Sequence, residues 1–308
     1  MSLSLYFIPF FSLHQDAAEE PVYGSYVELF QGVLGDKKPI FKGNVPDDYL
    51  IIDEPHKTLK HDIINADIDG HVGQIKASAQ VKPDPRDKKL FAIVTGVGRG
   101  KTRTLIEIMK KVNNDYKKTV CLAITFNHHF AVGGDWKHLG LKFRTIYAIN
   151  VVARIISMSY QLPFVEVEDL LFQGFNSLEK PNKSTPTDLI QSCIRFIVQQ
   201  YRANHHIIDH FVLLVDESVV IIDRLDPGNT MDIHSTLRDS LLSTSIRFDD
   251  DKSLSVDLVM SALNVGPTGV TSSGRTITPL TTSESLDVAE IWSKWVPAYI
   301  ENNFFFRN

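Results

Sequence analysis

Two segments of the chain carry residue types that together handle nucleoside triphosphates. The first, 95–102, reads Thr-Gly-Val-Gly-Arg-Gly-Lys-Thr and lies between an apolar run and a helix-like pattern. Its glycines let backbone N–H groups turn inward toward phosphate oxygens, and the following helix adds the positive end of its dipole. Lys101 has the length to reach the β- and γ-phosphates, and the Thr102 hydroxyl is a ligand for Mg²⁺. The segment therefore predicts a phosphate-binding loop (Walker A).

The loop departs from the usual pattern at its first position. In the usual pattern four residues separate a first glycine from the Gly-Lys pair, and this chain has Thr95 at that first position, with Gly96 beside it. The loop thus begins one residue late. A guanine-reading element is missing, because 182–185 lacks the acid of Asn-Lys-x-Asp, so adenine is the expected base. The residues expected to bind the nucleotide are Gly96, Val97, Gly98, Arg99, Gly100, Lys101, Thr102 and Arg103.

The second segment is an apolar run, 210–215, that ends in Asp216 and Glu217. We expect Asp216 to hold Mg²⁺ through water, opposite Thr102, as a Walker B carboxylate. Glu217 is then placed to polarise an attacking water as the general base. A strand ending in an acidic helix cap is the alternative for an isolated Asp-Glu pair, and the upstream phosphate loop argues against it.

Two further polar residues follow predicted strands or turns. Asn264 comes directly after 255–263 and is our candidate for sensing the γ-phosphate, with an ordinary loop cap as the equal alternative. Arg275, in the turn 272–275, is the candidate for stabilising transition-state charge in cis or in trans, with a solvent-facing arginine as its alternative. The predicted catalytic residues are therefore Lys101, Glu217, Asn264 and Arg275.

The elements that must position these residues alternate between strands and helices. A continuous apolar run predicts a buried strand at 90–94, and mainly apolar segments predict further buried strands at 119–126, 210–215 and 255–263. Helical spacing predicts helices at 102–112, 145–160 and 187–201, with a loop over 173–187. This order is typical of a parallel α/β sheet. The Glu that follows the metal-binding Asp favours the additional-strand class of P-loop NTPases, in which we expect 119–126 to be the extra strand.

Residues 1–85 differ from the rest of the chain. They carry scattered proline and glycine and no long helical period, so we expect a small irregular N-terminal segment. The charged, proline-containing stretch 82–89 marks the boundary to a P-loop domain at 86–308. Residues 2–13 are apolar and aromatic, but no positive charge precedes them and Pro9 interrupts them. We favour a docked apolar arm over a cleaved export signal.

Composition and charge limit the classes of partner. Of 308 residues, 43% are hydrophobic and 22% charged, which is ordinary for a globular protein. Lys and Arg total 32 against 37 Asp and Glu, so a net charge of −5 offers no general basic field for nucleic acid. Cys121 and Cys193 lack metal-like spacing and indicate a reducing, intracellular compartment. No stretch is long enough to span a bilayer, so no membrane partner is expected.

Five short pieces of the sequence resemble one known module. They are Val94–Arg103, Ala123–Asn127, Ala153–Ile156, Leu214–Glu217 and Ser273–Arg275. Together they resemble the P-loop NTPase module of Crinkler-type effectors from oomycetes and fungi, which is similar to that of trypanosome retrotransposon-hot-spot proteins. The resemblance covers about 90–280 and implies an AAA-like or STAND-like ATPase fold. Such effectors often add a ubiquitin-like N-terminal domain and a nuclease domain, are secreted, and many act in a host cell nucleus.

The chain departs from that family's layout. The Leu-Phe-Leu-Ala-Lys motif of the ubiquitin-like domain is absent, and about 30 residues follow Thr278, which leaves no room for a nuclease or a helical lid. Only the nucleotide site is carried over. We therefore predict Mg²⁺-dependent binding and slow hydrolysis of ATP, coupled to a protein partner, a homo-oligomer or a conformational switch. The alternatives are a non-hydrolysing switch or effector fragment, a nucleic-acid-associated ATPase, and a small-molecule kinase.

Overall fold

The computed structural model of the protein describes residues 23–41, 67–80, 90–94, 100–126, 141–178, 185–217, 246–247, 253–262 and 277–280. Within these ranges the chain forms six helices and six strands. In this described part, no helix combines the length and the apolar character needed to cross a membrane. The apolar arm 2–13 and the boundary stretch 82–89 lie outside the described residues.

Five strands form an all-parallel sheet, which confirms the predicted α/β class. Their order is β2 (Thr119–Thr125), β3 (His210–Asp216), β5 (Ser253–Ala262), β1 (Leu90–Val94) and β6 (Ile277–Leu280). The short β4 (Ile246–Arg247) pairs antiparallel with the start of β5. Every residue of β2 and β3 is buried, as expected for strands covered on both faces.

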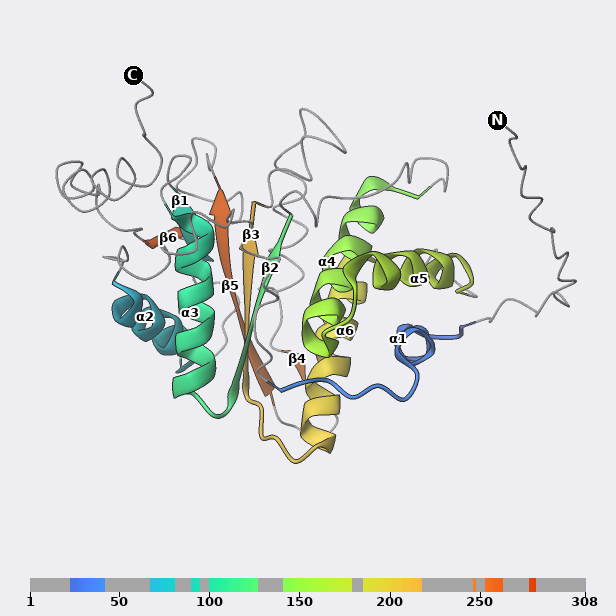
Figure 1. Cartoon of the computed structure of the whole chain (residues 1–308), viewed down its shortest axis with the longest axis horizontal. Helices are drawn as coiled ribbons and strands as arrows, with labels where there is room; N and C mark the ends of the chain where they lie inside the picture. Colours follow the sequence, from blue (N-terminus) through green and yellow to red (C-terminus); the bar gives the residue numbers. More distant parts are fainter. Residues whose placement is uncertain are drawn as a thin grey trace, which may run out of the picture.

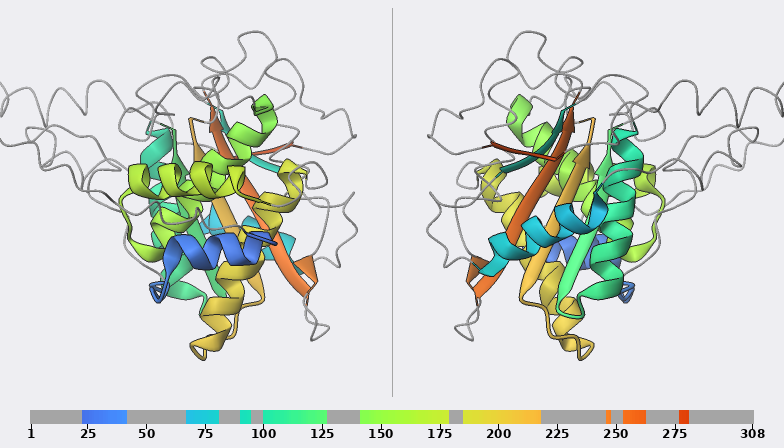
Figure 2. Two further views of the ribbon diagram at one scale, coloured as in Figure 1. Left: turned by 90° about the vertical axis from the view of Figure 1, so that its right-hand side faces the viewer. Right: turned by 90° about the vertical axis from the view of Figure 1, so that its left-hand side faces the viewer.

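Helices cover both faces of this sheet (Figure 1). One face carries α2 (Ile68–Gln80) and α3 (Lys101–Asp115). The other face carries α4 (Phe143–Tyr160) and α6 (Pro186–Ala203), with α5 (Phe164–Asn176) and α1 (Tyr26–Leu34) packed outside them. Figure 2 shows α1 and α5 lying across the outer side of this layer.

The alternation of side chains along each strand divides the core in two. In β3, Phe211 and Leu213 face the α4–α6 layer, whereas Val212 and Leu214 face α2 and α3. Asp216 continues the second set, so its side chain emerges on the α3 face at the end of the strand. The first residues of α3 are therefore placed beside the carboxyl end of β3.

The order of the strands corrects one prediction. The strand that separates β1 from β3 is β5, whereas β2 lies at the edge of the sheet beside β3. The expectation that 119–126 is inserted into the sheet as an extra strand is therefore wrong, because β5 is the strand that lies between β1 and β3. The prediction assumed that the strand following β1 in the chain lies close to it in the sheet. A crossover between parallel strands can instead lead to a more distant position in the sheet.

The N-terminal residues are not uniformly irregular, contrary to the prediction. Helix α1 begins after Ser25, whose side chain accepts a hydrogen bond from the backbone N–H of Glu28. Its buried face, which includes Leu29 and Phe30, packs on α5 and α6. Gly174 of α5 allows this contact, because a Cβ there would lie 2.3 Å from Leu29 Cδ1. Helix α5 also extends to Asn176, so the predicted loop 173–187 begins too early.

A buried polar network joins α2 to the sheet. Ser78 Oγ of α2 donates to Asp257 Oδ1 of β5 at 2.9 Å. Asp257 Oδ2 lies 2.8 Å from Nε2 of His210, whose Nδ1 is 3.5 Å from Thr119 Oγ1. Asp257 is completely buried, and both of its carboxylate oxygens are paired. The network thus satisfies a carboxylate that would otherwise be costly to bury.

Candidate functional site

Four of the predicted site residues meet at the carboxyl edge of the parallel sheet. Lys101 and Thr102 open α3, which follows β1 in the chain, and Asp216 ends β3, with Glu217 directly after it. Parallel strands bring their carboxyl ends to one edge, so residues more than one hundred positions apart converge there. Gly96, Val97, Gly98, Arg99, Asn264 and Arg275 lie outside the described residues.

Helix α3 begins after a glycine in the left-handed conformation. Gly100 is the N-cap, with φ +75° and ψ +22°, in the left-handed region that glycine adopts without strain. Its carbonyl accepts hydrogen bonds from the backbone N–H and the hydroxyl of Thr104, at 2.9 and 3.0 Å. The first N–H groups of an α-helix have no partner within the helix and attract anions. The end of α3 beside Asp216 is therefore its anion-binding end.

The Asp216 carboxylate is surrounded by hydroxyl groups. Thr102 Oγ1 donates to Asp216 Oδ2 at 2.7 Å, and Thr125 Oγ1 donates to the same oxygen at 3.4 Å. Ser261 Oγ of β5 donates to Asp216 Oδ1. Asp216 is 3% exposed, and this burial raises the pKa of its carboxyl, although the three hydroxyls and Lys101 act in the opposite direction.

Glu217 adds a second carboxylate in an unusual backbone conformation. Its φ is +52°, which costs a non-glycine residue energy and is typical of functional positions. Its backbone N–H donates to Ser261 Oγ at 3.4 Å, and its Oε1 lies 3.8 Å from Lys101 Nζ. Burial and the neighbouring Asp216 raise the pKa of Glu217, while Lys101 lowers it. We call Lys101, Thr102, Asp216, Glu217, Thr125 and Ser261 the edge cluster.

The donor set of the edge cluster suits a hard divalent cation. Two carboxylates face one lysine, which leaves a net negative charge when both are ionised. The Thr102 hydroxyl and the Asp216 carboxylate lie side by side, and oxygen ligands of these kinds are those that Mg²⁺ prefers. Within the described ranges, no three His, Cys, Asp or Glu side chains are grouped to hold a metal ion. A magnesium ion that keeps water and phosphate ligands needs only one or two protein carboxylates.

Arg103 does not join the edge cluster. Its Nε lies 3.8 Å from Glu107 Oε1, one turn further along α3, and its side chain is about a quarter exposed. Each residue of an α-helix is rotated by roughly 100° from the one before it, so Arg103 points away from the side that carries Lys101. Its predicted contact with the nucleotide therefore has no support from the position of its side chain.

Thr125 and Ser261 belong to the site although sequence reasoning did not select them. Ser261 lies on the face of β5 that also carries Ser253, Ser255 and Asp257 in the sequence, whereas the opposite face is apolar. Side chains two and four residues apart in a strand share a face, and Asp257 and Ser261 are both buried, so polar residues in this pattern signal buried partners. This signal was present in the sequence. Nothing in the sequence marked Thr125 as a site residue, apart from its place near the end of a predicted strand.

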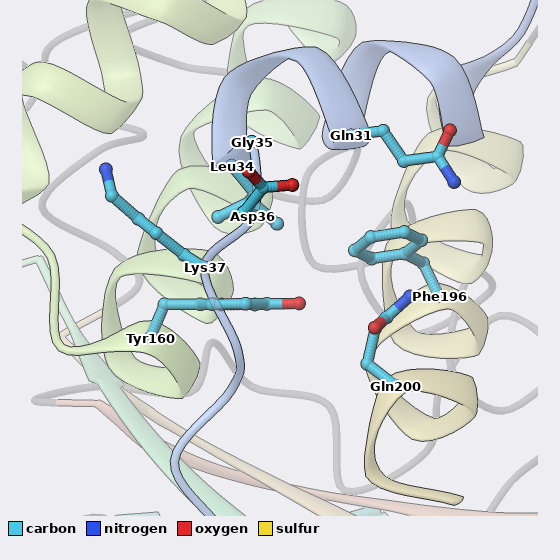
Figure 3. Close-up of a pocket in the computed structure, with 8 residues that line it drawn as sticks. All are labelled: Gln31, Leu34, Gly35, Asp36, Lys37, Tyr160, Phe196 and Gln200. Carbon is cyan, nitrogen blue, oxygen red and sulfur yellow. The ribbon is translucent and has the colours of Figure 1, made fainter. Parts of the chain in front are cut away.

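A pocket of about 390 Å³ lies at a different place in the fold, between α1, α4 and α6 (Figure 3). The rings of Tyr160 and Phe196 and the amides of Gln31 and Gln200 contribute to its lining. The other lining residues are Leu34, Gly35, Asp36 and Lys37. None of them belongs to the edge cluster, so the pocket is separate from the candidate site.

Glu168 of α5 is a buried carboxyl on the far side of the sheet from α3, and it makes stability depend on pH. It is 2% exposed, and its Oε1 has no hydrogen-bond partner among the described residues. Burial raises the pKa of Glu168 from 4.5 to about 7, although Arg154 opposes the shift. The stability contributed by the neutral carboxyl is therefore complete below about pH 4.5 and is lost as the pH rises through about 7.

Glu168→Gln is accordingly expected to stabilise the protein at pH 8 by about 2 kcal/mol, with the gain disappearing at pH 5. Urea unfolding at both pH values measures this difference. Glu166→Gln, an exposed neighbour in the first turn of the same helix, is the matched control and should change stability by at most about 1 kcal/mol, equally at both pH values. A gain that is equal at pH 5 and pH 8 would contradict the prediction.

Comparison with known proteins adds little to this geometry. No protein-family model matches the chain, and no curated protein matches its sequence. Among solved structures, the fold is similar to a chain in a structure of Drosophila ORC bound to DNA, at 12% identity and a TM-score of 0.30. That match covers 91% of this chain and 52% of the other, so this protein spans about half the length of the ORC chain. At this TM-score the likeness supports no conclusion about function.

Proposed function

We propose that the protein is a P-loop NTPase that binds ATP with Mg²⁺ and hydrolyses it slowly. The observation that carries the proposal is the meeting of Thr102 and Asp216 at 2.7 Å, beside the contact between Lys101 and Glu217 at 3.8 Å. Helix α3 begins with a lysine and a threonine, and they face the Asp-Glu pair at the end of β3. These are the kinds of residue that bind phosphate, hold Mg²⁺ and orient water in phosphoryl transfer.

The topology supports the same proposal. The lysine-bearing helix follows β1, the acidic pair ends β3, and β5 is inserted between those two strands. This arrangement is that of the additional-strand class, with β5 as the additional strand. The module of Crinkler-type effectors, which the sequence resembles, remains part of the proposal as the family to which this site belongs.

Each residue has a separate task in the proposed reaction. The amides at the start of α3 and Lys101 bind the phosphates, and Thr102 with Asp216 holds Mg²⁺, which neutralises charge on the phosphate oxygens when bound. Ser261 orients both acids, since it donates to Asp216 and accepts from the Glu217 backbone. Glu217 accepts the proton of the attacking water.

The proposal is tested by Lys101→Ala. Lys101 is 6% exposed, so its ammonium group contacts phosphate in a largely desolvated position, where a charge-assisted hydrogen bond contributes about 1.5–3 kcal/mol. We expect ATP affinity to fall about 10- to 100-fold, as measured by calorimetry with Mg²⁺ present. Lys110→Ala, on an exposed turn of the same helix, is the control. Wild-type affinity in both variants would overturn the proposal.

A non-hydrolysing nucleotide switch is the second candidate, and one observation favours it. Glu217 Oε1 is within ion-pair distance of Lys101, so the proposed base is engaged by the residue that would bind phosphate. If ATP leaves this pair intact, Glu217 is held away from water and the protein binds without turnover. Tight ATP binding with no release of phosphate by the wild-type protein would favour this candidate over the ATPase.

A further inference from the structure

Arg154 of α4 is a buried charge that the proposed reaction does not use. It is 1% exposed and is the largest of the fully buried side chains in the described part of the chain. Its guanidinium carbon lies 4.1 Å from the centroid of the Phe126 ring and 4.2 Å from that of Phe164. Burying a guanidinium is costly unless its donors are satisfied. An arginine held in this way needs an explanation.

The guanidinium is fixed by hydrogen bonds as well as by the two rings. Arg154 Nε donates to the carbonyl oxygen of Thr125 at 2.8 Å. Its Nη1 donates to both the carbonyl oxygen and the Oδ1 of Asn150, each at 2.9 Å. The amide of Asn150 in turn donates to the carbonyl oxygen of Ile146 at 3.1 Å. Arg154 therefore holds Thr125 and Phe126 in one position from the α4 face of the sheet.

The same two residues hold Asp216 from the other side. Thr125 Oγ1 donates to Asp216 Oδ2 at 3.4 Å, and the backbone N–H of Phe126 donates to the carbonyl oxygen of Asp216 at 3.1 Å. Thr125 and Phe126 thus connect Arg154 to the carboxylate through a short chain of contacts. A displacement of Arg154 would therefore also move the Asp216 carboxylate, which accepts the hydrogen bond from Thr102.

We infer that Arg154 is a positioning residue for the magnesium ligand Asp216 and acts through Thr125 and Phe126. The inference rests on the proposed function, because it assigns a task within the same site. The planar guanidinium bonds a carbonyl and packs between two rings at once, which a lysine ammonium cannot do. Groups that orient metal ligands from behind typically change metal affinity by about 10- to 100-fold when they are lost.

The experiment compares ATP affinity with and without Mg²⁺ in Arg154→Lys and in Asn150→Ala, which removes one of the groups that fix the guanidinium. Phosphate binding by Lys101 and the helix amides does not depend on Asp216, so affinity in EDTA should stay at the wild-type value. The gain in affinity that Mg²⁺ provides should fall about tenfold in both variants. A merely structural arginine would change stability or both affinities together, not the ratio between them.

Arg202→Lys is the matched control. Arg202 also uses its guanidinium to bond a backbone carbonyl, that of Ile208, through Nε at 3.2 Å and Nη2 at 2.7 Å. That carbonyl precedes β3, at the opposite end of the strand from Asp216. The control should therefore leave the magnesium effect unchanged. A reduced ratio in Arg202→Lys would show that any lost arginine disturbs the site, and would overturn the inference.

Folding failure does not block the test. If Arg154→Lys is not folded, Asn150→Ala carries it alone, because that change removes the Oδ1 that accepts from Arg154 Nη1 at 2.9 Å and leaves Thr125 and Asp216 unaltered. An unchanged magnesium effect in every folded variant, with a normal effect in the wild type, overturns the inference and leaves the proposed function standing. Absence of ATP binding by the wild type, with or without Mg²⁺, overturns both.

Discussion

Replacing Glu217 with glutamine is expected to slow ATP hydrolysis by about 10²–10⁴-fold, the usual contribution of a general base. Affinity for ATP should stay the same or rise, because the change removes the carboxylate that pairs with Lys101 at 3.8 Å. Glutamine keeps the size of the side chain and cannot accept the proton of the attacking water. Phosphate release in a single turnover, measured beside equilibrium binding, separates the two effects.

Glu107→Gln is the matched control for this experiment. Glu107 also lies close to a lysine, with Oε1 3.2 Å from Lys110 Nζ, but on the exposed side of α3. Its replacement should leave both binding and turnover as in the wild type. Unchanged turnover in Glu217→Gln would remove Glu217 from the reaction and reduce the acidic part of the proposed site to Asp216.

The pH dependence of turnover follows from the surroundings of Glu217. Burial and the nearby Asp216 raise the pKa of Glu217 above that of an ordinary glutamate, although Lys101 opposes this. A base works only when ionised, so hydrolysis should decline on acidification at a higher pH than an exposed glutamate would give. The decline should be absent from the residual activity of Glu217→Gln.

The strands and helices next to the site were predictable because the sequence pattern alone indicates their burial. Each of the four predicted strands is mainly apolar, and 90–94 is an unbroken apolar run that leads into the glycine loop. Thr102 and Asp216 were predicted to lie opposite each other because a phosphate-binding loop and an acidic strand end share one magnesium ion in P-loop NTPases. Parallel strands end at the same edge of the sheet. Thr102 and Asp216 therefore lie close together whatever the packing of the side chains around them.

The missed elements depend on tertiary contacts instead. Helix α2 contains Gly70 and Gly73, which weaken its helical pattern, and it is tied to the sheet through Val72, Ile75 and Ser78. Strand β6 has four residues and includes Pro279, which is tolerated because it lies at the edge of the sheet. Neither α2 nor β6 could be predicted from its own residues, because each is stabilised by contacts with other elements. The inserted position of β5 was missed for the same reason.

Asp257→Ala is expected to destabilise the protein by about 3–5 kcal/mol, the usual effect of removing one partner from a buried polar pair. The change leaves Ser78 Oγ and His210 Nε2 without the carboxylate that each contacts at 2.9 and 2.8 Å. Both groups are buried against α2 and the sheet, so water cannot replace the lost partner at low cost. The midpoint of urea unfolding measures the loss.

Asp209→Ala tests whether the effect comes from burial and not from the loss of any aspartate beside β3. Asp209 is more than half exposed, and its Oδ2 lies 4.0 Å from Lys118 Nζ, so its ion pair contributes about 0–1 kcal/mol. If Asp257→Ala lowers the free energy of unfolding by no more than Asp209→Ala does, the network does not hold α2 on the sheet. The attachment of α2 would then depend mainly on its apolar contacts, which are those of the buried Val72 and Ile75 and the partly buried Ile68.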